Sequence, residues 1–286
     1  MNELALSLVL IAAVLHATWN LLAKRAGGGV PFIFLYFSLS TVIYAPLAAA
    51  VWMLRPVTLT LVDVAFIVGN GLLHTAYFLT LQFGYAEGDL SLVYPLARGT
   101  GPLLASIAAI AFFGERPSDV AMSGIVAIVA GVFLASGVHR IRKSETKVSV
   151  AYGIATGVLI ALYTLWDKHA MSVLLLSPII YDWCGNFVRL ALLAPAVAGR
   201  GKEIVAAWRA HRFEALGVGV LSPLAYLLVL WALSWTPVTY VAPARELSIM
   251  FGTIFGITLL RERERAVQRA ISAGLMVAGI AALAHG

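Results

Sequence analysis

The sequence predicts an all-α membrane protein with ten transmembrane helices, arranged as two inverted five-helix repeats. Three observations lead to this fold class: an apolar composition, a succession of apolar runs of membrane-spanning length, and an internal repeat that divides these runs five and five. The 286 residues are 61% hydrophobic and 12% charged, about half the charged fraction of an average soluble domain. Such a chain cannot cover a soluble globule with polar groups, so the lipid bilayer is its expected surroundings.

Short segments containing Gly, Pro and charged residues separate the apolar runs. Each run has about the 20 residues that a helix needs to cross about 30 Å of hydrocarbon. The first run lacks a basic leader and a small-residue cleavage pattern, so we interpret it as the first span and not as a signal peptide. The predicted spans are 3–22, 32–54, 62–85, 90–113, 118–138, 149–170, 178–199, 213–234, 239–260 and 266–285.

The second half of the chain repeats features of the first half in the same order. The matches, which lie 144–149 residues apart, are Lys24-Arg25-Ala26 with Lys168-His169-Ala170, Ala76-Tyr77 with Ala225-Tyr226, Ala97-Arg98 with Ala244-Arg245, and Glu115-Arg116 with Glu262-Arg263. Collinear matches at nearly one offset indicate a duplication. Because each unit has an odd number of spans, the two units must have opposite orientations in the membrane.

The longest polar connection runs from His139 to Lys147, near the middle of the chain. It predicts a first repeat over 1–143, a linker over 144–148 and a second repeat over 149–286. In the loops, fourteen Lys and Arg residues lie on one side of the predicted membrane and three on the other. By the positive-inside rule, the first side faces the cytoplasm and both termini face outward. The predicted location is the inner cell membrane, with multiple spans.

Polar side chains inside the apolar spans are the candidates for a binding site. A charge at membrane depth costs about 2.5–3.5 kcal/mol on translocon scales, so it needs water or a partner. Helical spacing puts several of these side chains on shared faces, which indicates a wet interior between spans. The predicted substrate-binding residues are Trp19 and Asn20 in the first span, His74 and Tyr77 in the third, Tyr94 and Arg98 in the fourth, Tyr163 and Trp166 in the sixth, Arg189 in the seventh, and Arg245 and Glu246 in the ninth.

Arg98 and Arg245 occupy matching positions in the two repeats. At about 1.5 Å per residue, each lies about 9–12 Å inside its membrane face, and the inversion brings them in from opposite sides. We hypothesise that their guanidinium groups flank a central site and bind a carboxylate or phosphoryl group. The alternative is that each arginine pairs with a protein carboxylate, Glu246 being nearest in sequence, or caps carbonyls at a helix break. Arg189 has the same alternative, with Asp182 as its candidate partner.

His74 and four aromatic residues each have two interpretations. His74 can titrate near neutral pH, so it either couples proton movement to transport or is a hydrogen-bonded packing residue. Trp19, Tyr77, Tyr163 and Trp166 either present ring surfaces to the cargo or pack between helices. The residue types are compatible with both interpretations in each case.

Two segments carry a resemblance to a known family, YPLARGTGPLLASIAAIAFFGERPS at 94–118 and APARELSIMFGTIFGITLLRERE at 242–264. Each contains proline near its start and ends in a Glu-Arg charged turn. They resemble the fourth and ninth helices of EamA-type members of the drug/metabolite transporter superfamily, and helix count and duplication extend the resemblance over the whole chain. It implies a transporter, with export favoured, and leaves the cargo open. A solvated salt bridge or a topology anchor is sufficient to explain the Glu-Arg turns.

The predicted function is secondary active transport of a small anionic or zwitterionic metabolite, such as an amino acid or organic acid, by alternating access of the two halves. Protons or an exchanged solute would supply the energy. The alternatives are transport of phosphorylated or phosphonate metabolites, a membrane-embedded lipid-modifying enzyme, and a scaffold or sensor. The sequence contains no Walker A motif, metal-ligand cluster or nucleophile elbow, so we predict no enzyme activity, catalytic residue, metal or other cofactor. Nucleic acid is not an expected partner, and both a monomer and a homodimer stay open.

Overall fold

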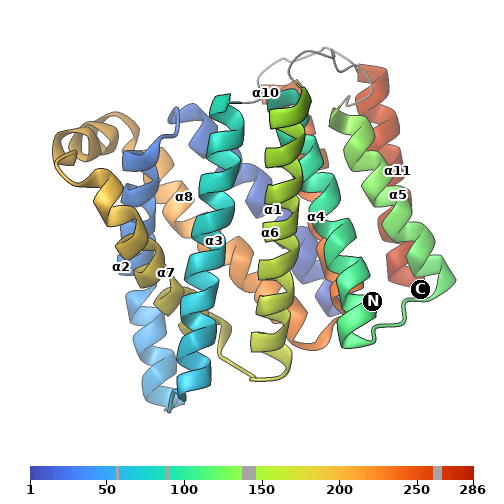
Figure 1. Cartoon of the computed structure of the whole chain (residues 1–286), viewed down its shortest axis with the longest axis horizontal. Coiled ribbons are helices and arrows are strands. Elements are labelled where there is room, and N and C mark those ends of the chain that lie inside the picture. Colours follow the sequence, from blue (N-terminus) through green and yellow to red (C-terminus); the bar gives the residue numbers. More distant parts are fainter. Residues whose placement is uncertain (56–57, 88–89, 137–145, 260–265) are drawn as a thin grey trace.

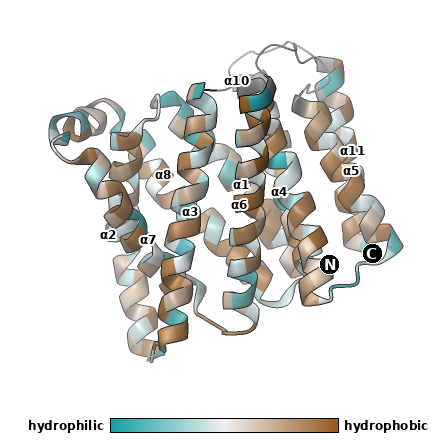
Figure 2. Cartoon of the chain, viewed as in Figure 1, coloured by the Kyte–Doolittle hydropathy of each residue, from teal (hydrophilic) through white to brown (hydrophobic). Residues whose placement is uncertain are grey.

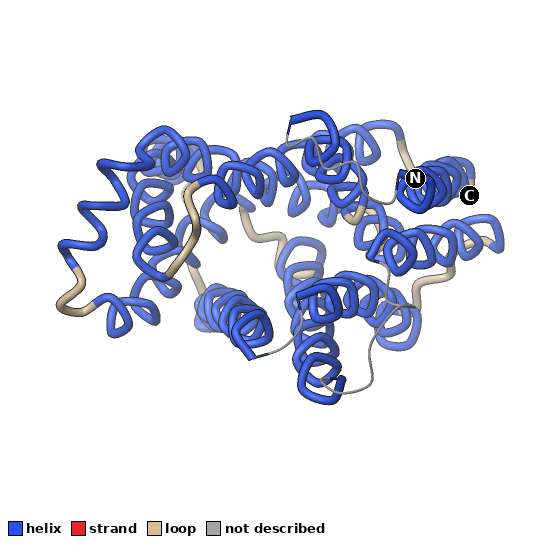
Figure 3. The backbone as a smooth tube through the Cα atoms, turned by 90° about the horizontal axis from the view of Figure 1, so that it is seen from above, coloured by secondary structure: helices blue, strands red, loops and turns tan. Residues whose placement is uncertain are grey.

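The computed structural model describes residues 1–55, 58–87, 90–136, 146–259 and 266–286. Within these ranges the chain forms eleven helices and no strand (Figures 1 and 3). The helices of the first repeat are α1 Glu3–Arg25, α2 Val30–Leu54, α3 Leu61–Glu87, α4 Leu90–Phe113 and α5 Asp119–Ser136. Those of the second are α6 Thr146–Ser172, α7 Pro178–Val197, α8 Gly201–Trp235, α9 Val238–Arg245, α10 Leu247–Leu259 and α11 Ala266–His285.

The ten predicted spans are confirmed, with α9 and α10 together forming the ninth. Six of the described helices, α1, α2, α3, α4, α6 and α8, are individually long and apolar enough to cross a bilayer, and α5 and α11 contain shorter apolar segments. The predicted linker at 144–148 lies partly outside the described residues, and its last three positions begin α6. The Glu262-Arg263 turn also lies outside the described residues.

The ninth span is not the single helix that we expected over 239–260, because it breaks after Arg245. Pro243 has no N–H to donate to the preceding turn, which weakens the helix at this point. Two backbone hydrogen bonds between residues three apart connect α9 to α10. Glu246 N donates to the carbonyl of Pro243 (3.0 Å), and Ile249 N donates to the carbonyl of Glu246 (2.9 Å). The break therefore lies directly at the predicted site residues of this span.

The eighth predicted span, 213–234, is the second part of a longer helix. α8 begins at Gly201 and bends at His211, whose backbone angles are not helical (φ −135°, ψ 36°). The part before the bend, 201–210, is mostly exposed and contains several charged residues, whereas the part after it is apolar and packs into the bundle. The membrane span is therefore the second part of α8.

The helices of the two repeats interleave. α4 packs against α6, α1 against α8, α2 against α7 and α8, and α5 against α11. Exchanging the repeats converts these contacts into one another: α3–α6 corresponds to α8–α1, α2–α8 to α7–α3, and α4–α6 to the contacts of α1 with α9 and α10. This is the pattern of inverted repeats related by a pseudo-twofold axis. Both chain ends lie at the same end of the bundle, where the amino group of Met1 donates to the carbonyl of Leu283 (3.2 Å) (Figure 1).

Interleaving changes the expected motion. If one sequence half rocked against the other, α4 would separate from α6 and α1 from α8. The α4–α6 contact is close because Gly153 and Gly157 have no side chain; a Cβ at Gly153 would lie 2.6 Å from the Cβ of Leu96. Tight contacts of this kind stabilise helix pairs in membranes. An alternating-access motion that keeps these contacts would move bodies that each combine helices of both repeats.

The molecule exposes apolar side chains and buries polar ones. Hydrophobic residues predominate along the helices (Figure 2), and large ones such as Leu61 and Phe112 are almost fully exposed. In contrast, Asn70, Asp167 and Glu246 are fully buried. The outer surface suits contact with lipid tails, and the buried polar groups define where a site can lie.

Candidate binding site

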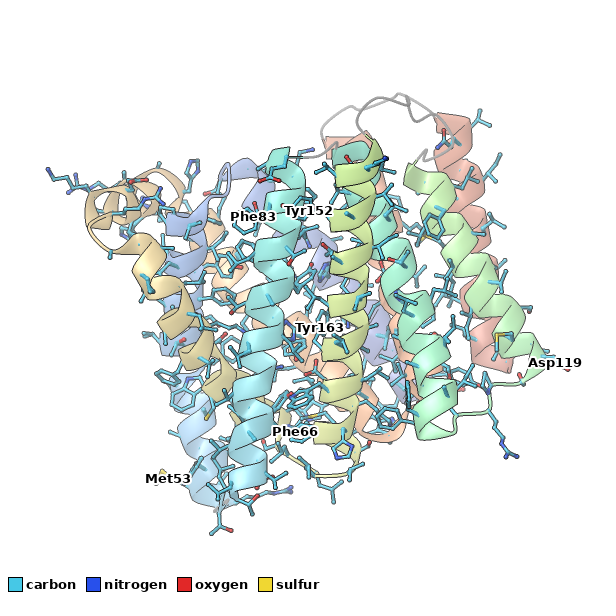
Figure 4. The ribbon with its side chains drawn as sticks, in the orientation of Figure 1. Met53, Phe66, Phe83, Asp119, Tyr152 and Tyr163 are labelled. Atoms are coloured by element: carbon cyan, nitrogen blue, oxygen red, sulfur yellow. The ribbon has the colours of Figure 1, made fainter. Side chains whose placement is uncertain are left out.

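Polar side chains converge around Tyr163, which lies on α6 near the mid-height of the bundle (Figure 4). The Tyr163 ring stacks on the His74 imidazole, with 4.3 Å between centroids, and meets the ring of Tyr77 edge-on at 5.6 Å. The Tyr163 hydroxyl accepts a hydrogen bond from Arg245 Nη2 (2.9 Å). Tyr163 thus joins two groups of polar residues, one around the arginines and one around Asp167.

The first group, here called the arginine cluster, consists of Arg98, Tyr163, Arg245, Glu246 and Ser248. Arg98 Nε on α4 lies 2.8 Å from Glu246 Oε2, and Arg98 Nη2 donates to Ser248 Oγ (2.9 Å). Both partners of Arg98 come from the α9–α10 break, so an arginine of the first repeat is bound to the broken helix of the second. Arg98 and Glu246 are buried, with 6% and 2% of their surface exposed.

The arginine cluster has unused capacity for hydrogen bonds. The Arg98 Nε–Glu246 Oε2 contact is short enough for an ion pair but poorly directed, and neither atom has a well-aligned hydrogen-bond partner among the described residues. Arg245 is only half-buried. Two guanidinium groups and one carboxylate leave a net charge of +1 in the cluster. A buried positive excess with free donors favours an anionic ligand, because charge-assisted hydrogen bonds to carboxylate or phosphoryl oxygens are strong.

The second group, here called the aspartate cluster, is built around Asp167 on α6. Its carboxylate accepts three hydrogen bonds, from Asn70 Nδ2 (3.0 Å), Tyr181 Oη (2.9 Å) and Tyr226 Oη (2.6 Å). The cluster consists of Asn70 and His74 on α3, Asp167 on α6, Tyr181, Asp182, Asn186 and Arg189 on α7, and Tyr226 on α8. Asp167 is therefore well satisfied by neutral donors.

Arg189 is the cation of the aspartate cluster. Its Nη1 donates to Asp182 Oδ1 (2.9 Å) and Asn186 Oδ1 (2.7 Å), and its Nη2 donates to Asn70 Oδ1 (2.6 Å). The pairing with Asp182 agrees with the protein-carboxylate interpretation of Arg189. These bonds use both terminal nitrogens, so Arg189 has less capacity for cargo than Arg245.

The turn between α8 and α9 is held by two charged side chains. Glu115, at the end of the first signature segment, accepts from the backbone N–H groups of Val238 (2.7 Å) and Thr239 (2.9 Å) and so caps the start of α9. Lys168 Nζ donates to the carbonyls of Leu233 (2.8 Å) and Thr236 (3.1 Å) at the end of α8. Both placements suit the helix dipoles. Glu115 thus differs from our expectation of a solvated salt bridge or topology anchor, because it caps a helix of the other repeat.

Most of the predicted site residues come together. Arg98, Arg245, Glu246 and Tyr163 are in the arginine cluster, and His74 and Tyr77 border it through their contacts with the Tyr163 ring. Tyr94 lies one turn before Arg98 on α4 and is 39% exposed. Trp19 meets the His16 ring edge-on at 4.8 Å, and His16 lies within electrostatic range of both arginines. The Trp19 indole N–H is buried with no hydrogen-bond partner among the described residues.

Three predicted site residues lie apart from the arginine cluster: Arg189, which belongs to the aspartate cluster, Trp166 and Asn20. The Trp166 ring stacks on Phe66 at 4.2 Å, and its Nε1 donates to the Phe66 carbonyl (2.9 Å), which agrees with the packing interpretation. Asn20 is exposed and donates to the carbonyl of His16 on its own helix (2.7 Å). In the described part of the chain, the contacts of Trp166 and Asn20 do not include Arg98 or Arg245.

The predicted substrate-binding residues included His74 and Arg189 of the aspartate cluster but omitted Ser248, Asp167 and Tyr226. Asp167 had a visible signal, an acidic residue within an apolar run, four positions after Tyr163. Tyr226 had a signal in its repeat match with Tyr77. The described residues contain no group of three or more His, Cys, Asp or Glu side chains placed to hold a metal ion.

Similarity to known proteins indicates both a family and a fold for this chain. A model of the EamA-like transporter family matches twice, over residues 3–137 and 147–284. A solved crystal structure, described only as that of a protein, is similar with a TM-score of 0.76 at 16% sequence identity, covering 99% of this chain and 96% of the other. At that identity the similarity establishes the fold alone. No curated protein matches the sequence.

Proposed function

Because this chain belongs to the EamA-like transporter family, we propose that it is a secondary active transporter of a small metabolite with a negatively charged group. The observation that carries the proposal is the arginine cluster, which joins two arginines of opposite repeats at a helix break and has a net charge of +1. Amino acids and organic acids are the proposed cargo class. The cell membrane is the proposed location, and alternating access the proposed mechanism.

Arg245 is the more accessible anion-binding group. It is half-buried, and its bond to the neutral Tyr163 hydroxyl leaves its charge without a directly bonded carboxylate among the described residues. Arg98 is held by Glu246 and Ser248, so it positions the broken helix and adds its charge to the site. The N-terminal end of α10 begins beside these residues, and its dipole adds further positive potential.

Glu246 favours a zwitterionic cargo. An amino acid carries an ammonium group beside its carboxylate, and the two groups match the opposite charges of Arg245 and Glu246, which are neighbours in the chain. Glu246 Oε2 lacks a well-aligned hydrogen-bond partner among the described residues, so it can accept from an ammonium group. The rings of Tyr77 and Tyr163 offer an apolar surface for the rest of the molecule.

Phosphorylated metabolites are the second candidate cargo. A guanidinium fork binds phosphoryl and carboxylate groups with similar geometry, and a net charge of +1 suits a monoanion of either kind. Glu246 counts against this candidate, because a carboxylate close to the phosphoryl group would repel it.

The proposal is tested with purified protein in liposomes. Counterflow of radiolabelled L-alanine, succinate, glycerol 3-phosphate and choline is measured, and each solute is recovered for mass spectrometry. We expect counterflow of an acid without chemical change, a strong loss in Arg245→Gln, and no loss in the matched control Arg200→Gln, whose arginine pairs with Glu203 on the exposed start of α8.

Four results would contradict the proposal, in three different ways. If choline is the only solute that shows counterflow, or if Arg245→Gln has the same counterflow as the wild type, the arginine cluster is not an anion-binding site. A chemically altered solute would favour the enzyme alternative. If no solute is transported and none is chemically altered, the scaffold or sensor alternative is favoured.

A further inference from the structure

The aspartate cluster contains more negative than positive charge. Asp167 and Asp182 face a single cation, Arg189, so the cluster has a net charge of −1 when His74 is neutral. Asp167 and Asp182 are 1% and 4% exposed. An uncompensated charge in a buried site is costly, and one bound proton would neutralise the cluster.

His74 is placed to take up this proton. Its Nε2 lies 3.1 Å from Tyr226 Oη and 3.7 Å from Asp167 Oδ2. Tyr226 donates its hydroxyl proton to Asp167, so its oxygen can accept from Nε2–H of neutral His74. Nδ1 is then the basic nitrogen, and a proton added to its lone pair gives an imidazolium beside the carboxylate while no other bond breaks. His74 is 18% exposed, which leaves a route for the proton.

We propose that His74 and Asp167 form a proton-binding site that is coupled to cargo binding through Tyr163. This inference rests on the proposed transport function. The charged and titratable groups that face the pair are Tyr181, Asp182 and Arg189 from α7, Tyr226 from α8, Tyr163 from α6 itself, and Arg245 from α9 through its bond to Tyr163. Asn70 on α3 links Asp167 to Arg189.

The link to the cargo is electrostatic. Tyr163 stacks on His74 and accepts a hydrogen bond from Arg245. When His74 is protonated, the Tyr163 side chain therefore has two positively charged neighbours, His74 and Arg245. A cargo anion at Arg245 offsets the repulsion between the two cations. Proton and anion therefore strengthen each other's binding, and by linkage the effect is reciprocal. Under an inward proton gradient such coupling drives uptake, in contrast to the export that the family resemblance implies.

Proton binding is measured directly and without cargo. Protein labelled with ¹⁵N-histidine is reconstituted in lipid nanodiscs and titrated by NMR between about pH 5 and about pH 8, the range in which histidine changes charge. His74→Gln identifies the His74 resonance, and His285→Gln, which removes an exposed histidine near the chain end, is the control. We expect the His74 resonance to titrate in the wild type and in the control, and not to titrate over this range in Asp167→Asn. A wild-type His74 resonance that does not change, or one whose titration is the same in Asp167→Asn, overturns the inference.

Coupling is measured separately in liposomes with L-alanine and succinate as probes. We expect an imposed pH gradient to drive accumulation of at least one probe along the direction of proton flow in the wild type. His74→Gln and Asp167→Asn should lose this accumulation to a greater extent than they lose counterflow without a gradient. Counterflow that is present while accumulation ignores the pH gradient overturns the coupling and leaves the transport function intact. If neither probe shows counterflow, the transport proposal fails for these cargo classes, and the NMR titration still decides whether the pair binds a proton.

Discussion

The two polar clusters differ in how completely their charged groups are bonded. In the aspartate cluster, Asp167 accepts three hydrogen bonds and Arg189 uses both terminal nitrogens. In the arginine cluster, Arg98 and Glu246 form a poorly directed ion pair, and Arg245 is half-buried with a neutral partner. The well-bonded cluster suits a fixed role in stability and proton binding, whereas the incompletely bonded cluster is suited to receive a ligand.

Among the substitutions in the two clusters, removal of the Arg98 side chain should have the largest effect on stability and counterflow. Arg98→Ala leaves the Glu246 carboxylate buried without its cation, and breaking a buried pair in this way costs about 3–5 kcal/mol. We expect a lower unfolding temperature in detergent and loss of counterflow. Arg98→Ala/Glu246→Ala should recover much of the stability and none of the counterflow. A single variant as stable as the wild type would show that the pair does not hold the broken helix.

Asp182→Asn tests the structural role of the aspartate cluster. The substitution keeps an oxygen acceptor for Arg189 Nη1 but removes the negative charge, and a hydrogen bond to a charged group contributes about 1.5–3 kcal/mol. We expect a loss of stability smaller than that value in chemical unfolding, because the substitution also removes the excess negative charge of the aspartate cluster. Counterflow per folded molecule should fall far less than in Arg245→Gln. Equal losses of counterflow in the two variants would mean that both clusters bind the cargo.

Tyr163→Phe separates the two contacts of the residue that joins the clusters. Phenylalanine keeps the stacking on His74 but removes the hydroxyl that accepts from Arg245. A hydrogen bond of a charged group contributes about 1.5–3 kcal/mol, here to the position of Arg245, so its loss should weaken cargo binding by at most that amount. The measurement is the concentration of cargo that gives half-maximal counterflow. An unchanged value would show that Arg245 does not depend on Tyr163 for its position.

Glu115→Gln should have the smallest effect. The amide has one oxygen for the two N–H groups that the carboxylate now binds, and the loss of charge at the start of α9 costs about 0.3–1 kcal/mol. We expect a small decrease in unfolding temperature, with Asp119→Asn, on the exposed start of α5, as the control. If Glu115→Gln lowers the unfolding temperature no more than Asp119→Asn does, Glu115 does not stabilise α9 by capping it.

Composition and periodicity predicted the membrane fold because lipid selects long apolar runs. The internal repeat predicted the inverted architecture, and it singled out Arg98 and Arg245 as matching positions. The break after Arg245 was not predictable from proline alone. α4 continues as one helix through Pro102, whereas the ninth span breaks two residues after Pro243. The outcome depends on the tertiary partners that satisfy the freed backbone groups.

The contacts between helices were the least predictable part of the site. The four-residue spacing of Tyr163 and Asp167 puts both on one face of α6, but it does not show that Tyr181 and Tyr226 from α7 and α8 bind Asp167. Those contacts depend on how the repeats interleave. Trp166 is the converse case. Its helical spacing predicted a site residue, but in the structure its ring stacks on Phe66.

The most direct test of the arginine cluster compares matched acids and amides. Purified protein is screened by thermal unfolding against L-alanine, succinate and glycerol 3-phosphate, and against alaninamide and succinamide, which lack the charged carboxylates. A ligand that binds the folded protein raises its unfolding temperature. We expect stabilisation of the wild type by at least one acid and by neither amide, and loss of that stabilisation in Arg245→Gln. Equal stabilisation by an acid and its amide, or an undiminished effect in Arg245→Gln, would contradict the assignment of this cluster as the anion-binding site.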